Sequence, residues 1–205
     1  QNLPGTIDHL MKYNPSYISC TYGAGGGNVG ANREVCQMIK NAGTTPVTHF
    51  TVIKNTKEGI KEQLDQYLAD GVDHMLALRG DIPLGETTTC GDFDYATDLV
   101  KFVRDTYGDK FEIAVAGSPE GHISCRSLES DIAVLKQKQD NGADYIMTQL
   151  CWDMEQFKYW LDAIRKAGIT MPVDVGVMPI LDQAATINMA LSRNGCVMDR
   201  ELSRM

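Results

Sequence analysis

The sequence lacks any uninterrupted apolar stretch long enough to span a bilayer, and it does not begin with a basic segment followed by an apolar one. We therefore expect neither a membrane anchor nor a secretory leader. Basic residues are also in the minority, because 19 Lys and Arg stand against 27 Asp and Glu, which gives a net charge of −8. This balance argues against a nucleic-acid partner and against an anionic membrane surface.

The cysteines form no local pattern. None belongs to a Cys-x-x-Cys pair, and none clusters with histidine. Such scattering favours reduced thiols over a disulfide framework or a zinc site, and it predicts a cytoplasmic protein. The six positions are 20, 36, 90, 125, 151 and 196.

What the sequence does contain is a repeating unit of amphipathic helix, glycine, short apolar strand and loop. The spacing of about thirty residues is typical of parallel βαβ units. The first helix, near 6–13, is expected to be already under way where the sequence begins, and a last helical segment is expected to reach about residue 192. Six strands are predicted, near 17–21, 46–52, 74–78, 112–116, 144–148 and 173–177.

Local signals also predict helix ends and helix faces. Thr56 is expected to cap the helix that follows it, and Asp153 is expected to form a capping box with Gln156 at the start of another helix. Tyr95 and Leu99 are expected to face inward from a helix that extends to about residue 103.

Polar residues follow or end most of these strands, for example Thr21, His49, Asp81, His122 and Gln149. A doubly wound sheet and a (β/α)8 TIM barrel both fit the alternation. A doubly wound sheet concentrates its site at one switch point, so the even spread favours the barrel. We expect a single α/β domain over 1–205 that is an incomplete barrel of about six βα units. One strand is expected before residue 1 and one after the last residue.

The stretch 74–83 shows the clearest concentration of functional groups. An apolar run of strand length ends in Arg79-Gly80-Asp81, and a proline stops further pairing. Two opposite charges around a glycine at a strand end suit a ligand that approaches the backbone closely. A surface turn with an ordinary ion pair is the alternative.

A glycine-rich loop at 23–30 satisfies the pattern Gly-x-Gly-x-x-Gly between a strand and a helix. The next strand ends without the acidic residue that would bind a ribose, so a loop that offers backbone N–H groups to another ligand, or a structural loop, competes with a dinucleotide site. His49, His122 and Asp81 could bind a metal, but their spacing does not support this, and no metal site is predicted.

Two further pairs of residues have both a functional and an ordinary explanation. A carboxylate such as Asp81 could stabilise positive charge or tune a cofactor, and Gln149 could recognise the edge of a heterocycle. Asp131 and Lys138 lie seven residues apart on one predicted helix and share a face, which solvation alone would explain.

Five collinear motifs resemble those of methylenetetrahydrofolate reductases. They cover the sequence from about residue 15 to residue 180. The motifs are Thr-Tyr-Gly-Ala-Gly-Gly at 21–26, Leu-Arg-Gly-Asp-Ile-Pro at 78–83, Pro-Glu-Gly-His at 119–122, Gly-Ala-Asp-Tyr-Ile-Met-Thr-Gln at 142–149 and Gly-Val-Met-Pro-Ile at 176–180.

The resemblance implies a (β/α)8 barrel with non-covalently bound FAD. NAD(P)H would reduce the flavin, which would pass a hydride to 5,10-methylenetetrahydrofolate to give 5-methyltetrahydrofolate. It implies catalytic and folate-binding roles for Asp81 and Gln149, with Asp131 and Lys138 turned inward at the helix start. The implied FAD contacts are Thr21, His49, Leu78, Arg79, Gly80, Asp81, Tyr95, Ala96, Ala116, Ser118, His122, Asp131 and Lys138.

The sequence also departs from the family pattern. The first barrel strand, which bears a glutamate that would act as general acid, is absent, as is the closing eighth strand. Ser118 stands where many relatives have tyrosine. These departures leave two alternatives: a non-catalytic folate- or flavin-binding subunit that needs a partner for the missing acid, and a cofactor-free barrel lyase. A homo-oligomer or a subunit of a complex is expected.

Overall fold

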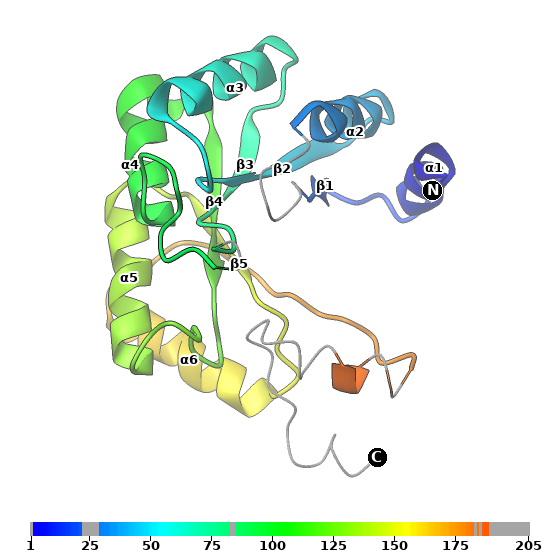
Figure 1. Ribbon diagram of the computed structural model, residues 1–205. Coiled ribbons are helices and arrows are strands. Elements are labelled where there is room, and N and C mark those ends of the chain that lie inside the picture. Colours follow the sequence, from blue (N-terminus) through cyan, green and yellow to red (C-terminus); the bar gives the residue numbers. More distant parts are fainter. Residues whose placement is uncertain (1, 22–28, 83–84, 183, 185, 189–205) are drawn as a thin grey trace. The chain divides into compact units, whose positions relative to one another are not determined.

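The computed structural model describes residues 2–21, 29–82, 85–182, 184 and 186–188. Strands and helices alternate along this part of the chain (Figure 1). None of its helices has both the length and the apolar character needed to cross a membrane. The elements are α1 (Leu3–Met11), β1 (Tyr17–Cys20), α2 (Val29–Asn41), β2 (Thr45–Thr51), α3 (Lys57–Ala69), β3 (His74–Leu78), α4 (Ala96–Tyr107), the 3-10 turn η1 (Gly108–Lys110), β4 (Glu112–Gly117), α5 (Leu128–Asp140), β5 (Tyr145–Thr148), α6 (Met154–Lys166) and β6 (Val173–Asp174).

The strands follow chain order in the sheet, β1-β2-β3-β4-β5-β6. β1 pairs in parallel with β2, β2 with β3, and β5 with β6. A doubly wound sheet would reverse its order at a switch point, whereas sequential parallel strands with helical crossovers are the order of a (β/α)8 barrel. The predicted α/β class, with six parallel strands consistent with an incomplete barrel, is therefore confirmed.

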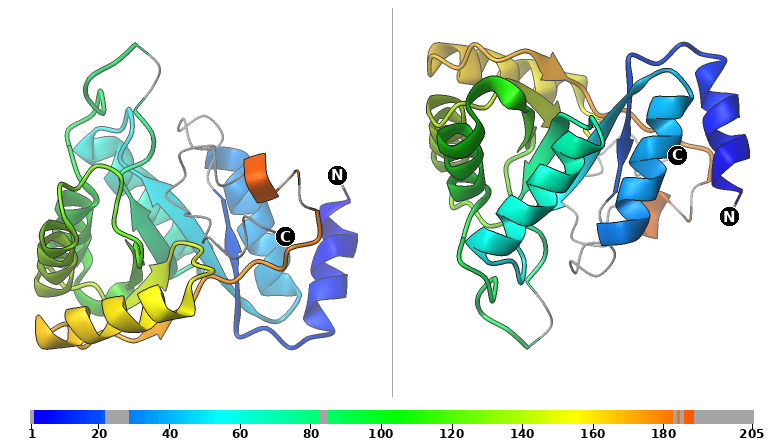
Figure 2. Two further views of the ribbon diagram at one scale, coloured as in Figure 1. Left: turned by 90° about the horizontal axis from the view of Figure 1, so that it is seen from below. Right: turned by 90° about the horizontal axis from the view of Figure 1, so that it is seen from above.

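The described part of the chain comprises two compact units, residues 1–114 and 115–205. In the first unit, helix α2 packs on β1 and β2, helix α4 packs on β3, and α1 lies beside α2 (Figure 2). The register pairs Cys20 with Thr48 and His49 with Leu76. Because side chains alternate along a strand, Thr48 and Phe50 share the face that α2 and α3 cover, while His49 points to the opposite face.

A buried polar cluster joins β1, β2 and the two helices of this face. The Asn32 amide oxygen accepts hydrogen bonds from the hydroxyls of Thr48 at 2.9 Å and Tyr67 at 2.7 Å. The Asn32 amide nitrogen donates to the Cys20 carbonyl at 3.2 Å. All four side chains are buried, so each of these bonds satisfies a group that has lost contact with water.

The helix starts of the first unit test two predictions that were made from the local sequence. Helix α3 begins where predicted, with the Thr56 side chain accepting from the Gly59 N–H at 3.1 Å. The prediction that the first helix is already under way at the start was wrong. The Asn2 side chain accepts from the Gly5 N–H at 3.2 Å, and a proline stands in the first turn, so this helix has its own beginning.

In the second unit, helix α6 packs its buried Phe157, Trp160 and Ile164 inward. Its predicted cap is confirmed, because Asp153 accepts from the N–H groups of Glu155 and Gln156, each at 2.9 Å. The Gln156 side chain does not complete a capping box and instead donates to the Pro119 carbonyl at 2.7 Å. The last strand is shorter than the predicted 173–177 and ends at Asp174, because Gly176 donates its N–H to the Thr148 hydroxyl rather than to a ladder.

The Asn32 cluster generates a stability prediction. Asn32→Ala removes the acceptor shared by the Thr48 and Tyr67 hydroxyls, and leaving buried hydroxyls unpaired should lower the free energy of unfolding by about 2–4 kcal/mol. Urea unfolding measures the loss. Glu34→Ala, an exposed change on the same helix, serves as the control and should shift the midpoint little. Equal midpoints for the two variants would show that the cluster does not stabilise this unit.

Candidate functional site

The predicted site residues of the first unit include Thr21, which directly follows the end of β1 at Cys20. Two others, His49 and Leu78, lie on one face of the sheet. His49 is paired in register with Leu76, and Thr51 with Leu78, so Leu78 faces the same side as His49. This is the face of the sheet opposite to α2 and α3. Burial lowers the pKa of His49, which keeps its imidazole neutral at pH 7.

The end of β3 continues into Arg79-Gly80-Asp81. Gly80 has a φ of +85°, and a Cβ built on it would lie 2.6 Å from Ile53 Cγ1 and 3.1 Å from Thr51 Cβ. A glycine is thus required by both conformation and space. The Asp81 side chain is exposed to solvent at this end. An exposed carboxylate is compatible both with a ligand site and with an ordinary surface turn, so the predicted role of Asp81 stays a prediction.

Thr51 was not predicted as a site residue. Its hydroxyl is the only buried side-chain polar atom without a hydrogen-bond partner in the described ranges of the chain. It lies at the carboxyl end of β2, on the same face as His49, and beside the backbone of Gly80. A buried hydroxyl without a partner carries a free-energy cost that an added ligand could remove.

Tyr95 and Ala96 mark the beginning of helix α4. Tyr95 was predicted to pack inward with Leu99, and this was wrong: Tyr95 is the N-cap residue and its side chain is 61% exposed. Its N–H donates to the Asp98 carboxylate at 2.9 Å, which completes the helix start. The aromatic ring is therefore available to an external partner rather than to the core.

In the second unit, Lys138 is the residue with the most unusual surroundings. Its ammonium group donates to the Ala116 carbonyl of β4 at 2.9 Å. Burial lowers the pKa of Lys138, while the neighbouring Asp131 and Cys125 act in the opposite direction. Lys138 lies in the last turn of α5, so its expected place at the helix start was wrong. Its long side chain reaches from the helix to the strand and carries the ammonium group out of water.

Asp131 ties the loop after β4 to helix α5. Its carboxylate accepts from the His122 backbone N–H at 3.1 Å and from the Cys125 thiol at 3.6 Å. The His122 ring accepts at Nδ1 from the Ser124 N–H at 3.2 Å. Four predicted residues are thereby brought together by direct contacts and shared electrostatics: Ala116, His122, Asp131 and Lys138. The prediction that Asp131 and Lys138 face the same side is confirmed.

Gln149 and Ser118 lie close by in the same unit. The Gln149 N–H donates to the Gly117 carbonyl at 2.7 Å, which places Gln149 immediately beside the residue before Ser118. The Gln149 side-chain oxygen accepts from the Leu150 N–H at 2.9 Å. The half-buried Trp152 donates from its indole N–H to the Met178 carbonyl at 3.3 Å and so fixes the neighbouring loop.

The second unit therefore presents a desolvated cation beside a carboxylate. The half-buried Lys138 ammonium donates to one carbonyl among the described residues, so it retains donor capacity for an anionic ligand. Asp131 still offers acceptor positions for hydroxyl groups, because a carboxylate can accept about four hydrogen bonds. This donor set fits a phosphate attached to a sugar.

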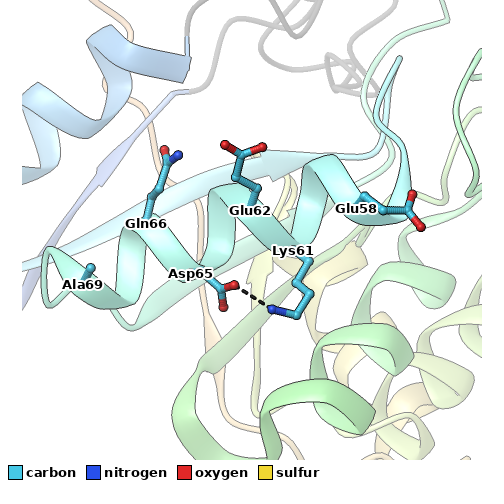
Figure 3. Close-up of a pocket in the computed structure, with 6 residues that line it drawn as sticks. All are labelled: Glu58, Lys61, Glu62, Asp65, Gln66 and Ala69. Carbon is cyan, nitrogen blue, oxygen red and sulfur yellow. Dashed lines mark hydrogen bonds and ion pairs between the residues drawn. The ribbon is translucent and has the colours of Figure 1, made fainter.

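Two surface hollows lie elsewhere. One is formed along helix α3 alone, where Lys61 and Asp65 form an ion pair at 2.7 Å (Figure 3). The other lies between α2 and Asp70. Neither contains a predicted site residue, and an exposed helix surface offers no convergent polar groups for catalysis. The residues drawn in Figure 3 are Glu58, Lys61, Glu62, Asp65, Gln66 and Ala69.

Some predictions fall on parts of the chain outside the described residues. These are most of the glycine-rich loop at 23–30 and most of the last helical segment, of which only positions 184 and 186–188 are described and helical. Among the residues that are described, no three His, Cys, Asp or Glu side chains converge as metal ligands.

Comparison with known proteins identifies the sequence family. The family model for methylenetetrahydrofolate reductase matches residues 1–196. Methylenetetrahydrofolate reductase (NADH) 1 of Arabidopsis thaliana is 36% identical over 203 residues, which cover 93% of this chain and 34% of that protein. The 5,10-methylenetetrahydrofolate reductase of Escherichia coli is 33% identical over 181 residues, covering 88% of this chain and 60% of that protein. The chain thus spans about a third of the plant relative and three fifths of the bacterial one.

Solved structures share the fold at much lower identity. A 2,3-dimethylmalate lyase aligns with a TM-score of 0.60 at 12% identity, covering 97% of this chain and 82% of that one. A phosphonopyruvate hydrolase aligns with a TM-score of 0.61 at 13% identity, covering 95% and 71%. At such identities the likeness concerns the architecture alone.

The close packing around Gly80 predicts that an alanine substitution lowers stability more at Gly80 than at Gly85. Gly80→Ala should destabilise the chain by about 2–4 kcal/mol, because it combines a positive φ with overpacking against Ile53. Gly85→Ala is the matched control, since φ is +91° there but no atom lies within 4 Å. Its loss should be only the backbone part, about 1 kcal/mol. Similar losses in thermal unfolding would contradict the packing account.

Burial of His49 predicts a pH dependence of stability. The folded state holds the pKa of His49 below its usual value, so the unfolded chain takes up the proton more readily as pH falls. Stability should therefore be lost as pH drops from about 6.5 toward the lowered pKa. His49→Gln should reduce this loss, whereas exposed His9→Gln should not. Urea midpoints at several pH values test this, and identical profiles for wild type and His49→Gln would contradict it.

Proposed function

Because the chain belongs to the methylenetetrahydrofolate reductase family, we propose that it contributes the flavin and folate site of a reductase that converts 5,10-methylenetetrahydrofolate to 5-methyltetrahydrofolate with NAD(P)H. The observation that carries the proposal is the match of the family model across residues 1–196, which contain all the predicted site residues. Because the chain spans only part of its relatives' length, the proposal concerns binding by this chain and turnover by the whole protein.

The second unit supports the proposal, because it contains a positive charge and a hydrogen-bond acceptor that suit a dinucleotide. Lys138 supplies a positive charge in a desolvated position, where electrostatic interactions are stronger than in water. Asp131 can accept from ribose hydroxyls while it continues to anchor the loop at His122. We propose that Lys138 and Asp131, with Ala116, Ser118 and His122, contact non-covalently bound FAD.

The first unit supports the proposal through one face of its sheet. His49 and Leu78 share this face, Thr21 directly follows β1, and the neutral imidazole of His49 can donate or accept a hydrogen bond. The Thr51 hydroxyl, which lacks a partner in the described chain, is suited to a heterocycle edge or a ribityl hydroxyl. The further proposed contacts in this unit are Arg79, Gly80, Asp81, Tyr95 and Ala96.

Bound flavin supplies the hydride-transfer chemistry between the nicotinamide and the folate. The residues of the chain itself would orient the substrate and polarise it. Asp81 places a negative charge at the end of β3, where it stabilises positive charge that develops on the substrate. Gln149, fixed at its backbone by Gly117, offers both a donor and an acceptor to the edge of the pterin ring.

We further propose that the protein acts in the cytoplasm as a homo-oligomer or within a complex. Its net charge of −8 gives no support for a nucleic-acid or membrane partner. The name of the plant relative includes NADH, which supports a nicotinamide donor for this chain.

Lys138 provides the sharpest test on this chain. Lys138→Met keeps the length of the side chain but removes the charge, and it should weaken FAD binding at least about tenfold, because charge-assisted hydrogen bonds contribute more than neutral ones. Lys136→Met is the matched control, since Lys136 lies on the same helix and pairs with Asp140. Quenching of flavin fluorescence gives both dissociation constants.

Circular dichroism and thermal unfolding of both variants separate a binding effect from a loss of fold. Equal FAD affinity of Lys138→Met and wild type would remove Lys138 from the flavin site. A folded wild-type chain that binds the folate but no FAD would favour a non-catalytic folate-binding subunit.

A further inference from the structure

Two cysteines that are distant in sequence meet within the Asn32 cluster. Cys20 is the last residue of β1, and Cys36 lies in the middle of α2. The exposed fraction is 8% for Cys20 and 0% for Cys36. The Asn32 side chain contacts both sulfurs: its amide nitrogen donates to Cys20 Sγ at 3.3 Å, and its amide oxygen accepts from Cys36 Sγ at 3.5 Å. The Asn32 side chain thus forms a hydrogen bond with each of the two sulfurs.

The two thiols interact electrostatically, and they differ in character. The interaction with Cys36 lowers the pKa of Cys20, whereas the same interaction and burial raise the pKa of Cys36. Cys20 is therefore the more readily ionised thiol and belongs to the more exposed residue, and Cys36 remains a protonated thiol. A nucleophilic thiol beside a second thiol is the arrangement in which oxidation leads to a disulfide.

We propose that Cys20 and Cys36 form a redox-active dithiol, in which a small peroxide oxidises Cys20 and Cys36 then closes an intramolecular disulfide. In the first step the Cys20 thiolate attacks the peroxide, the O–O bond breaks, and Cys20 sulfenic acid and hydroxide form. In the second step the Cys36 sulfur displaces the sulfenic oxygen, an S–S bond forms, and water leaves. Overall two thiols and one hydrogen peroxide give one disulfide and two waters.

Oxidation would also change the hydrogen bonds of residues around the two sulfurs. A disulfide removes the thiol proton that Cys36 donates to Asn32, and Asn32 also binds Thr48 of β2 and Tyr67 of α3. β1 leads directly from Cys20 into Thr21. If the proposed flavin contact of Thr21 is correct, the dithiol state would be communicated to the cofactor site; the disulfide itself does not depend on that function.

The other described cysteines have different surroundings. Cys90 is exposed on a loop and bonds to Thr88, Cys125 donates to Asp131, and the Cys151 thiol donates to the Asp153 carbonyl at 3.3 Å. Of the described cysteines, Cys20 and Cys36 are the two whose sulfurs both contact the Asn32 side chain. Peroxide should therefore join this pair in the folded chain and should only add oxygen to exposed Cys90.

Peptide mapping of the full chain tests the proposal. Trypsin cuts after Lys12, Arg33 and Lys40, so Cys20 falls in peptide 13–33 and Cys36 in peptide 34–40, each with a single cysteine. After peroxide treatment of the folded chain, alkylation and digestion, we expect these two peptides to be joined and to separate on reduction. Recovery of both cysteines in alkylated form, or joining only after prior unfolding in urea, would overturn the proposal.

Two variants identify the order of the steps. In Cys36→Ser, peroxide should leave a sulfenic acid on Cys20 that a dimedone probe labels. In Cys20→Ser, labelling of Cys36 should be at least several-fold weaker. Stronger labelling of Cys36 than of Cys20 would overturn the assignment of Cys20 as the attacking thiol. Thermal unfolding and circular dichroism of both variants, recorded before oxidation, verify that each is folded when it is labelled.

Discussion

The alternation of side chains in parallel strands, with one face of the sheet covered by helices, is the constraint on which the rest of this structure depends. Residues of one parity along β1 and β2, including Cys20 and Thr48, must find partners among the helices, and Asn32 provides them. Residues of the other parity, including His49 and Leu76, are turned to the opposite face. The buried polar cluster and the proposed flavin contacts are thus two consequences of one register.

In the second unit the corresponding constraint is the free-energy cost of desolvating a charge. The Lys138 ammonium loses contact with water and donates a hydrogen bond to one carbonyl of β4, and Asp131 lies close enough to interact with its charge. A buried cation with so few partners does not maximise stability, and such positions are typical of binding sites. Asp131 couples this charge to the loop at His122, so loop position and site charge depend on each other.

Much of this could be predicted from the sequence, because strand ends, caps and glycines are local signals. Thr56 and Asp153 were identified as caps, and the even spread of polar residues over the strand ends favoured the sequential strand order of a barrel. Other features required long-range contacts. The helical spacing places Tyr95 on the face that packs against the core, yet Tyr95 is the N-cap residue of the helix and is exposed. Cys20 and Cys36, sixteen positions apart, give no local signal, and only the packing of α2 on β1 brings their sulfurs together.

The most direct test of the central proposal is whether the wild-type chain itself retains flavin. The purified chain is mixed with excess FAD, passed over a desalting column, and its visible absorption spectrum is recorded together with the protein concentration. Our account predicts a flavin spectrum at close to one equivalent per chain, with bands altered from those of free FAD by the protein surroundings. A folded chain that emerges colourless would contradict it.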